Sequence, residues 1–184
     1  LGDTFLSMRF LTLLPNYGAE ISLLVTKSME NLLEHLDYRI KILTQKTSED
    51  QYDHVCALGD LFSIFNISGS NIPLTKTYIN IDEKWILKWK NKINKKKLNV
   101  GIVWQGNKNS EADEGRSFNL NYFKNISKID DIELVSLQKN DGIEQLNNFK
   151  LSNKITDFSD ELDLKAKFMD TAGLMKNLEQ EPAP

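Results

Sequence analysis

The hydrophobic positions of this chain fall into short, β-branched runs separated by stretches in which apolar residues recur every three or four positions. Short runs of this kind are typical of buried strands, and the longer spacing is typical of amphipathic helices. In the first half the pattern predicts strands at 21–25, 40–43 and 52–58, with helices at 5–14, 28–36 and 60–65. Because strands and helices alternate, the pattern predicts an α/β fold with a parallel sheet.

A second α/β half is expected from residue 98 onward. The pattern predicts strands at 98–104, 132–137 and 154–158, and helices at 120–129, 142–149 and 168–178. We therefore expect an N-terminal half at 1–81, a linker helix at 82–97, a second half at 98–179 and a polar tail at 180–184.

The expected linker helix carries two aromatic residues on one face. Asp82 is a good N-cap, and Trp85, Trp89 and Ile93 follow at four-residue spacing. Such a face favours packing across a domain junction, with stacking of the indoles on a sugar as the alternative. The seven lysines between 84 and 97 indicate a solvated helix face that runs into a hinge, with a membrane-surface or phosphate role as the alternative.

Composition narrows the class of protein. The chain has 184 residues, of which 40% are hydrophobic and 27% are charged, as in a globular protein. Its formal net charge is −3, so there is no basic excess that would favour nucleic acid as a partner. No apolar run is long enough to span a membrane and no leader pattern is visible, so we expect a cytoplasmic protein. The single cysteine, Cys56, fits a reducing compartment and is expected to be a buried structural thiol.

Candidate chemistry gathers where the strand beginning at 98 ends. A polar loop follows it, and Gly106 and Gly115 allow its backbone to approach a ligand. The loop offers Gln105, Asn107, Lys108, Arg116 and Ser117 as donors for a phosphate or a sugar hydroxyl. Open α/β sheets bind ligands beyond the carboxyl ends of such strands, although an ordinary polar loop would show the same composition. Next along the chain, Gln138 and Lys139 end the following strand on the same sheet edge, where they would contact a base or ribose. A solvated side chain is the equal alternative for Lys139.

Several of these stretches, taken in order, carry a family resemblance. They resemble the catalytic region of bacterial tetratricopeptide-repeat proteins, which is similar to heptosyltransferases and, more distantly, to O-linked N-acetylglucosamine transferase. The stretches are Gly2-Asp3-Thr4, Trp104 to Asn107, Arg116-Ser117, Ser136 to Lys139 and Phe168 to Ala172. The resemblance implies a GT-B fold, in which two Rossmann-like domains face each other across a cleft, with the acceptor on the first and a nucleotide-sugar donor on the second.

The resemblance also implies roles for individual residues. Asp3 matches a base that acts on the acceptor hydroxyl, although it would equally serve as a helix cap. Arg116 matches a basic residue that neutralises the donor diphosphate. The loop residues beside it would offer backbone N–H groups to that diphosphate, and Ser117 would cap the following helix. In Asp170-Thr171, at the start of the last helix, N-capping is the expected role.

The implied function is an inverting glycosyltransferase that moves a sugar from a nucleotide-diphosphate donor to an unknown glycan, lipid-linked or protein acceptor. The donor is a substrate, so no cofactor is implied, and His35 and His54 lack metal-ligand spacing. Compared with the family pattern, we expect this chain to be a partial and inactive fragment. Its open sheet edges would then be able to pair with a second copy of the chain. The competing hypothesis is a non-catalytic module of the same fold that binds a nucleotide or a protein.

Overall fold

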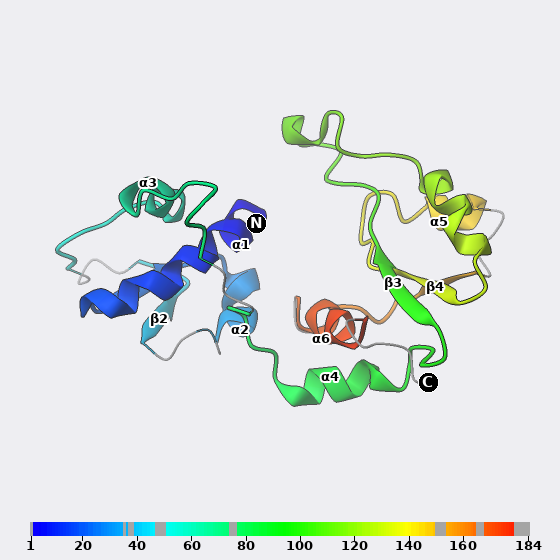
Figure 1. The fold of residues 1–184 in the computed structure, drawn as a ribbon, viewed down its shortest axis with the longest axis horizontal. Coiled ribbons are helices and arrows are strands. Elements are labelled where there is room, and N and C mark those ends of the chain that lie inside the picture. The colour runs from blue at the N-terminus through cyan, green and yellow to red at the C-terminus, as the bar shows by residue number, and fades with distance from the viewer. Residues whose placement is uncertain are drawn as a thin grey trace. The chain divides into compact units, whose positions relative to one another are not determined.

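The computed structural model describes residues 2–34, 36, 39–46, 51–73, 77–149, 154–164 and 168–178. Contacts within the chain divide it into two compact units, Leu1–Ile81 and Asp82–Pro184. Each unit holds its own parallel sheet, so the expected α/β class is confirmed at that level (Figure 1).

The first unit is built around a parallel pair of strands. Strand β1 (Ile21–Leu24) pairs with β2 (Ile40–Leu43), with Ile21 opposite Ile40. The segment between them contains the 3-10 helix η2 (Lys27–Met29) and helix α2 (Glu30–Leu33). Helix α1 (Gly2–Met8) leads into η1 (Arg9–Tyr17), and η3 (Leu58–Asp60) leads into α3 (Leu61–Ile64). Gly18 ends η1 with a φ of 71°, a left-handed conformation that glycine adopts easily.

The prediction of a third strand in this unit, at 52–58, is wrong. Residues 51–57 are exposed and form no strand, and in the described part of the unit β1 and β2 pair only with each other. Val55 is 77% exposed and Cys56 is exposed too, so the expected buried thiol is also wrong. The backbone N–H of Ala57 instead donates to the Asp60 carboxylate, which starts η3. The apolar run is short, and in the described residues no strand lies beside it to supply a ladder of backbone hydrogen bonds.

The second unit contains a three-stranded sheet in the order β3-β4-β5, all parallel. Its strands are β3 (Leu98–Ile102), β4 (Ile132–Ser136) and β5 (Ile155–Asp157). Its helices are α4 (Glu83–Lys90), η4 (Glu111–Asp113), η5 (Leu120–Lys124), η6 (Ile126–Lys128), α5 (Gln145–Asn148) and α6 (Met169–Leu178). Parallel register brings the carboxyl ends of β3 and β4 together, with Ile102 opposite Ser136.

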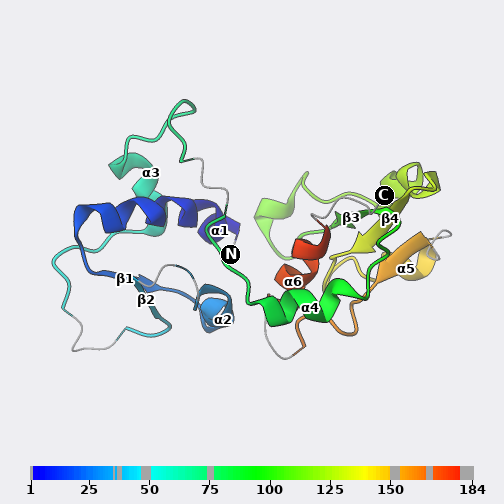
Figure 2. The same cartoon turned by 60° about the horizontal axis from the view of Figure 1, so that its bottom comes forward.

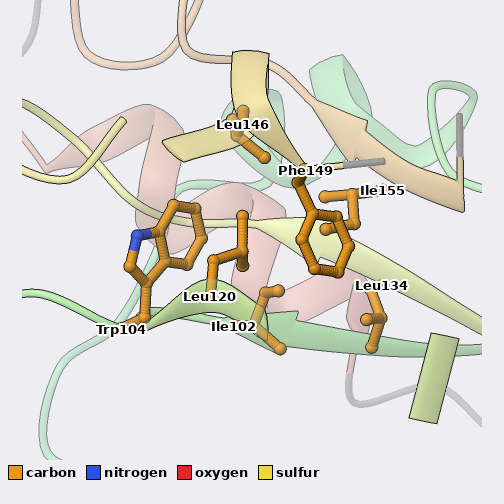
Figure 3. Packing of buried hydrophobic residues seen from close by; sticks show 7 residues of the cluster. All are labelled: Ile102, Trp104, Leu120, Leu134, Leu146, Phe149 and Ile155. Carbon is orange, nitrogen blue, oxygen red and sulfur yellow. The ribbon is translucent and has the colours of Figure 1, made fainter. Parts of the chain in front are cut away.

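One face of this sheet is covered by an apolar cluster (Figure 3). Its buried members are Ile102, Trp104, Leu120, Leu134, Leu146, Phe149 and Ile155. The indole nitrogen of Trp104 lies at the edge of the cluster, and it donates to the carbonyl of Gly142 at 3.0 Å (Figure 3). The cluster joins all three strands to the loop after β3 and to α5, so burial of these side chains holds that loop on the sheet.

The opposite face is covered by α4 and α6, which lie side by side in both views (Figure 2). Val135, which alternates with Leu134 along β4, is buried there with Trp89, Leu162 and Leu174. Trp89 has no exposed surface, so stacking of this indole on a sugar is excluded. Side chains therefore cover the sheet on both faces, as a parallel sheet requires.

The start of α6 is held by two aspartates. Asp163 is the capping residue, because its carboxylate accepts from the backbone N–H groups of Asp170 at 2.8 Å and Thr171 at 3.2 Å. The expected capping role of Asp170 is therefore wrong. Asp170 is only 3% exposed, and its carboxylate accepts from the indole N–H of Trp89 at 3.0 Å and pairs with the ammonium of Lys88 at 2.5 Å.

Three of the clustered lysines form ion pairs. Lys88 pairs with Asp170, and the ammonium of Lys92 pairs with the carboxylate of Glu161. The ammonium of Lys84 lies 2.7 Å from a carboxylate oxygen of Asp82. Asp82 caps α4 as expected, because its carboxylate accepts from the backbone N–H of Lys84 at 3.0 Å.

Several expected helices differ from the observed elements. In the first unit, the helix expected at 5–14 is α1 followed by η1, and the helix expected at 28–36 is η2 followed by the short α2. The helix expected at 120–129 is instead the pair η5 and η6, and the Ser127 hydroxyl donates to the Lys124 carbonyl between them. The helix expected at 142–149 is shorter, because Gly142 has a φ of 87° and α5 begins at Gln145. Side-chain bonds to the backbone and left-handed residues favour turns, and apolar spacing does not reveal either.

A search of the helices in the described ranges finds none that is both long enough and apolar enough to cross a membrane.

The contact between α4 and α6 leads to a stability prediction for Gly173. A β-carbon at Gly173 would lie 2.6 Å from the carbonyl oxygen of Trp85 and 2.7 Å from its carbonyl carbon. We expect Gly173→Ala to destabilise the second unit by about 1–3 kcal/mol, although alanine favours helices by about 0.5–1 kcal/mol.

Tryptophan fluorescence during urea unfolding measures this effect, because all three tryptophans lie in the second unit. Met175→Ala in the same helix is the control; its side chain is 49% exposed, and we expect a change within about 0.5 kcal/mol. Equal stability of Gly173→Ala and the unsubstituted chain would show that the close contact between α4 and α6 is not formed.

Candidate functional site

A pocket of about 410 Å³ opens where β3 ends. Its walls come from the residues directly after the strand and from the returning part of the loop that follows. The lining residues are Val103, Trp104, Gln105, Gly106, Asn107, Ser110, Ala112, Asp113, Arg116 and Phe118. The structure thus brings together four of the expected site residues, Gln105, Gly106, Asn107 and Arg116, at the carboxyl edge of the sheet.

The side chain of Gln138 lies behind this pocket and fixes its floor. It is 3% exposed, and its amide oxygen accepts from the backbone N–H groups of Trp104 and Gln105, each at 3.0 Å. Its amide nitrogen donates to the carbonyls of Gln105 at 2.8 Å and Asp141 at 2.6 Å. All of these bonds hold backbone, so we assign Gln138 a positioning role and not direct ligand contact.

Gly142 is fitted to the same floor. A β-carbon there would lie 2.6 Å from the β-carbon of Gln105 and 3.1 Å from the indole nitrogen of Trp104, and the residue has a φ of 87°. Only glycine meets both conditions without strain. The turn at 139–142 therefore packs directly against the pocket loop.

Two of the three backbone donors expected for a phosphate at Gln105, Gly106 and Asn107 are already in use. The N–H of Gln105 donates to Gln138, and the N–H of Gly106 donates to the Ser117 hydroxyl at 2.9 Å. These two N–H groups are therefore not open to a ligand in this structure, because each backbone N–H supplies one donor.

Ser117 links the two sides of the loop. Its hydroxyl donates to both carboxylate oxygens of Asp113, at 2.6 and 2.7 Å, while accepting from Gly106. The expected capping role of Ser117 is wrong, because Asn119 caps η5 by accepting from the Asn121 N–H at 2.9 Å.

The cationic residues of the site have different surroundings. Arg116 is exposed and lines the pocket, and only its backbone N–H is bonded, to the Asp113 carbonyl at 3.0 Å, among the contacts found in the described residues. Lys139 is half-buried, and its ammonium donates to the Leu162 carbonyl, so it joins the sheet edge to the segment before α6. The guanidinium of Arg116 is thus the cationic group of the pocket lining itself.

Lys108 ties the pocket loop to the turn that follows β4. Its backbone N–H donates to the Asp141 carboxylate at 3.1 Å, and its ammonium lies 2.8 Å from a carboxylate oxygen of Glu144. The hydrogen bond from Lys108 holds the pKa of Glu144 below its ordinary value, and the same bond raises the pKa of Lys108. Both side chains are about half exposed, so this pair is a minor restraint on the loop.

The remaining candidates lie elsewhere. Asp3 is exposed and belongs to the first unit. Because α1 begins at Gly2, Asp3 is a residue of the first helical turn and not the N-cap residue before the helix. His54 is exposed, and His35 lies outside the described residues. In the described ranges, no three histidine, cysteine, aspartate or glutamate side chains gather as metal ligands would.

Asp113 is the site residue that sequence reasoning missed. It lines the pocket, and its carboxylate lies so close to Gly106 that a β-carbon there would be 2.3 Å from one oxygen. The available signal is the spacing of Asp113, Arg116 and Ser117 within one short loop. The sequence-based prediction considered only the hydrogen-bond donors of this loop and not its carboxylate acceptors.

Comparisons with known protein families, with curated proteins and with solved structures find no match to this chain.

The position of Gln138 leads to a prediction for the pocket floor. Gln138→Ala would leave a buried backbone group at Trp104 and partly buried ones at Gln105 and Asp141 without these partners. An unsatisfied buried group costs about 1–3 kcal/mol, so we expect a loss of at least about 2 kcal/mol in urea unfolding of the second unit.

The matched control is Gln105→Ala, since the side chain of Gln105 is half-buried and accepts one long bond, 3.3 Å from Gln145. We expect it to cost less than about 1 kcal/mol. If Gln138→Ala were no more harmful than Gln105→Ala, the positioning role of Gln138 would be wrong.

A second prediction concerns the pair between Lys108 and Glu144. Because this hydrogen bond lowers the pKa of Glu144, the pair stabilises the fold at pH values above the ordinary carboxyl range and is lost as the pH falls through the lowered pKa. We expect Lys108→Ala to raise the pKa of Glu144 toward its ordinary value of 4.5, as measured by NMR titration of the side-chain carboxyl carbons. Lys124→Ala, which removes an exposed lysine of η5, should leave the Glu144 titration unchanged.

Proposed function

We propose that this chain binds the nucleoside diphosphate part of a sugar donor in the pocket after β3 and that the chain is part of an inverting glycosyltransferase. The observation that carries this proposal is an open pocket at the carboxyl end of a parallel strand, with an exposed arginine in its wall. That edge is where open α/β sheets bind nucleotides, and a planar guanidinium can bind phosphate oxygens with two parallel hydrogen bonds. The family resemblance of the loop supports the same ligand.

Within this proposal Arg116 has an electrostatic role. Transfer of the sugar breaks the bond between the anomeric carbon and the diphosphate, and negative charge grows on the departing oxygen. A guanidinium placed there stabilises that charge more strongly in the transition state than in the bound donor. Since the N–H groups of Gln105 and Gly106 are engaged within the chain, Arg116 carries the phosphate contact.

Asp3 is the proposed base for the acceptor. Its exposed carboxylate would take the proton of the acceptor hydroxyl as the hydroxyl oxygen bonds to the anomeric carbon. The attack and the departure occur on opposite sides of that carbon, so its configuration inverts. The full proposal is thus a GT-B enzyme made of two Rossmann-like domains, with Asp3 in the first unit and the donor pocket in the second.

Calorimetric titration with ADP, GDP, CDP and UDP tests the donor site. We expect one of these nucleotides to bind best, and we expect Arg116→Ala to weaken that binding at least tenfold, because a charge-assisted hydrogen bond is worth about 1.5–3 kcal/mol. Lys124→Ala removes one positive charge from the same unit away from the pocket, and we expect it to change the dissociation constant less than twofold.

Two results would contradict the donor site: no binding of any of the four nucleotides, or equal affinity of the unsubstituted chain and Arg116→Ala. Binding that depends on Arg116, in a protein that transfers no sugar from any donor, would favour the non-catalytic nucleotide-binding module.

A further inference from the structure

Asp113 places a negatively charged carboxylate in the lining of the pocket, which also contains the positively charged guanidinium of Arg116. The carboxylate belongs to η4, is partly exposed and faces the pocket between Ala112 and Arg116. It is held in place by the Ser117 hydroxyl, which donates to both of its oxygens at 2.6 and 2.7 Å. Gly106 has no side chain, and one oxygen of Asp113 occupies the space that a β-carbon would take there, 2.3 Å from its ideal position.

This arrangement disfavours a phosphate at the Gly106 end of the pocket. An anion there would meet a carboxylate of the same charge, and the nearby N–H groups of Gln105 and Gly106 are already bonded within the chain. The Arg116 end is therefore the favoured place for the phosphate. The part of the ligand that reaches Gly106 must instead donate hydrogen bonds, because an ionised carboxylate only accepts them.

We propose that Asp113 binds a vicinal diol of the ligand, an inference that rests on the proposed donor site. A carboxylate has about four lone-pair positions, and the hydroxyl proton of Ser117 occupies only part of them. The carboxylate of Asp113 can therefore accept hydrogen bonds from two further hydroxyls. Carboxylates read the ribose hydroxyls of nucleotides in other α/β sheets in this way. The apolar side chains of Val103 and Phe118, which are 57% and 42% exposed, provide apolar surface for the carbon face of a ring.

The diol has two sources, the ribose of the nucleotide and the ring of the transferred sugar. Calorimetry with ADP, GDP, CDP and UDP, their 2′-deoxy counterparts and their glucose conjugates separates them. If the ribose is bound, we expect the 2′-deoxy nucleotide to bind about tenfold more weakly than its ribose form. If the sugar is bound, we expect the glucose conjugate to bind about tenfold more tightly than the free nucleotide.

Asp113→Asn is the decisive variant, because it keeps the shape and an oxygen for Ser117 but removes the charge. We expect the tenfold preference to fall to twofold or less, and we expect inorganic pyrophosphate, which has no diol, to bind severalfold more tightly than it binds the unsubstituted chain. A purely structural role would not strengthen pyrophosphate binding. Glu111→Gln in the same η4 turn makes the same charge change outside the pocket lining and should alter neither quantity.

The outcomes distinguish this inference from the proposed function. If a nucleotide binds through Arg116 but neither the hydroxyl preference nor pyrophosphate affinity differs between Asp113→Asn and Glu111→Gln, the diol site is wrong and the donor site stands. If no nucleotide binds the unsubstituted chain, both are overturned. A loss of preference confined to Asp113→Asn supports both.

Discussion

The side chain of Gln138 accepts two hydrogen bonds and donates two, which join the ends of two strands, and the candidate pocket depends on them. Parallel strands end at the same edge of a sheet, but nothing in that rule fixes the loops beyond them. Here the chain after β3 must turn away from the sheet while the N–H groups of Trp104 and Gln105 still find partners. The buried amide supplies an acceptor for both and donors for the neighbouring carbonyls, which lets the loop open into a pocket without leaving buried polar groups unpaired.

Helices α4 and α6, which cover the other face of the sheet, also stabilise the sheet edge at which the pocket opens. Asp170 is buried against Trp89 and Lys88, so α4 and α6 are tied by an ion pair and an indole hydrogen bond in addition to apolar contacts. A buried carboxylate without partners would be costly, so these helices are expected to form their contact together. Lys139 extends the same support to the pocket edge, because its ammonium reaches the carbonyl of Leu162, a residue buried beside Trp89.

Apolar patterning predicted the parts of the fold in which burial decides the structure. The strands of the second unit agree with the apolar runs to within two residues, because side chains cover both sheet faces at β4. The pattern failed at 52–58, where the same kind of run has no strand beside it and Val55 is exposed. A sequence shows which segments would be buried as strands, but pairing depends on what the rest of the chain places next to them.

The site was predictable in place but not in detail. The polar loop after β3 correctly indicated where the pocket lies, and Arg116 lines it. Residue spacing alone did not reveal that the side chain of Gln138 would form its hydrogen bonds with backbone groups. It also did not reveal that the Ser117 hydroxyl would donate to Asp113, or that the carboxylate of Asp113 would lie beside Gly106. These are contacts between residues on different turns, and each changes what the pocket accepts: fewer backbone donors for an anion and one strong acceptor for hydroxyls.

Amide NMR of the ¹⁵N-labelled chain during titration with ADP, GDP, CDP and UDP tests the central claim most directly, because it locates binding without any substitution. The account predicts that the nucleotide that binds shifts the signals of residues 103–118 most, together with the side-chain Nε–H of Arg116, while signals from residues 2–34 stay nearly unchanged. Largest shifts in the first unit, or shifts that leave the pocket loop unaffected, would show that the ligand site of this protein lies elsewhere.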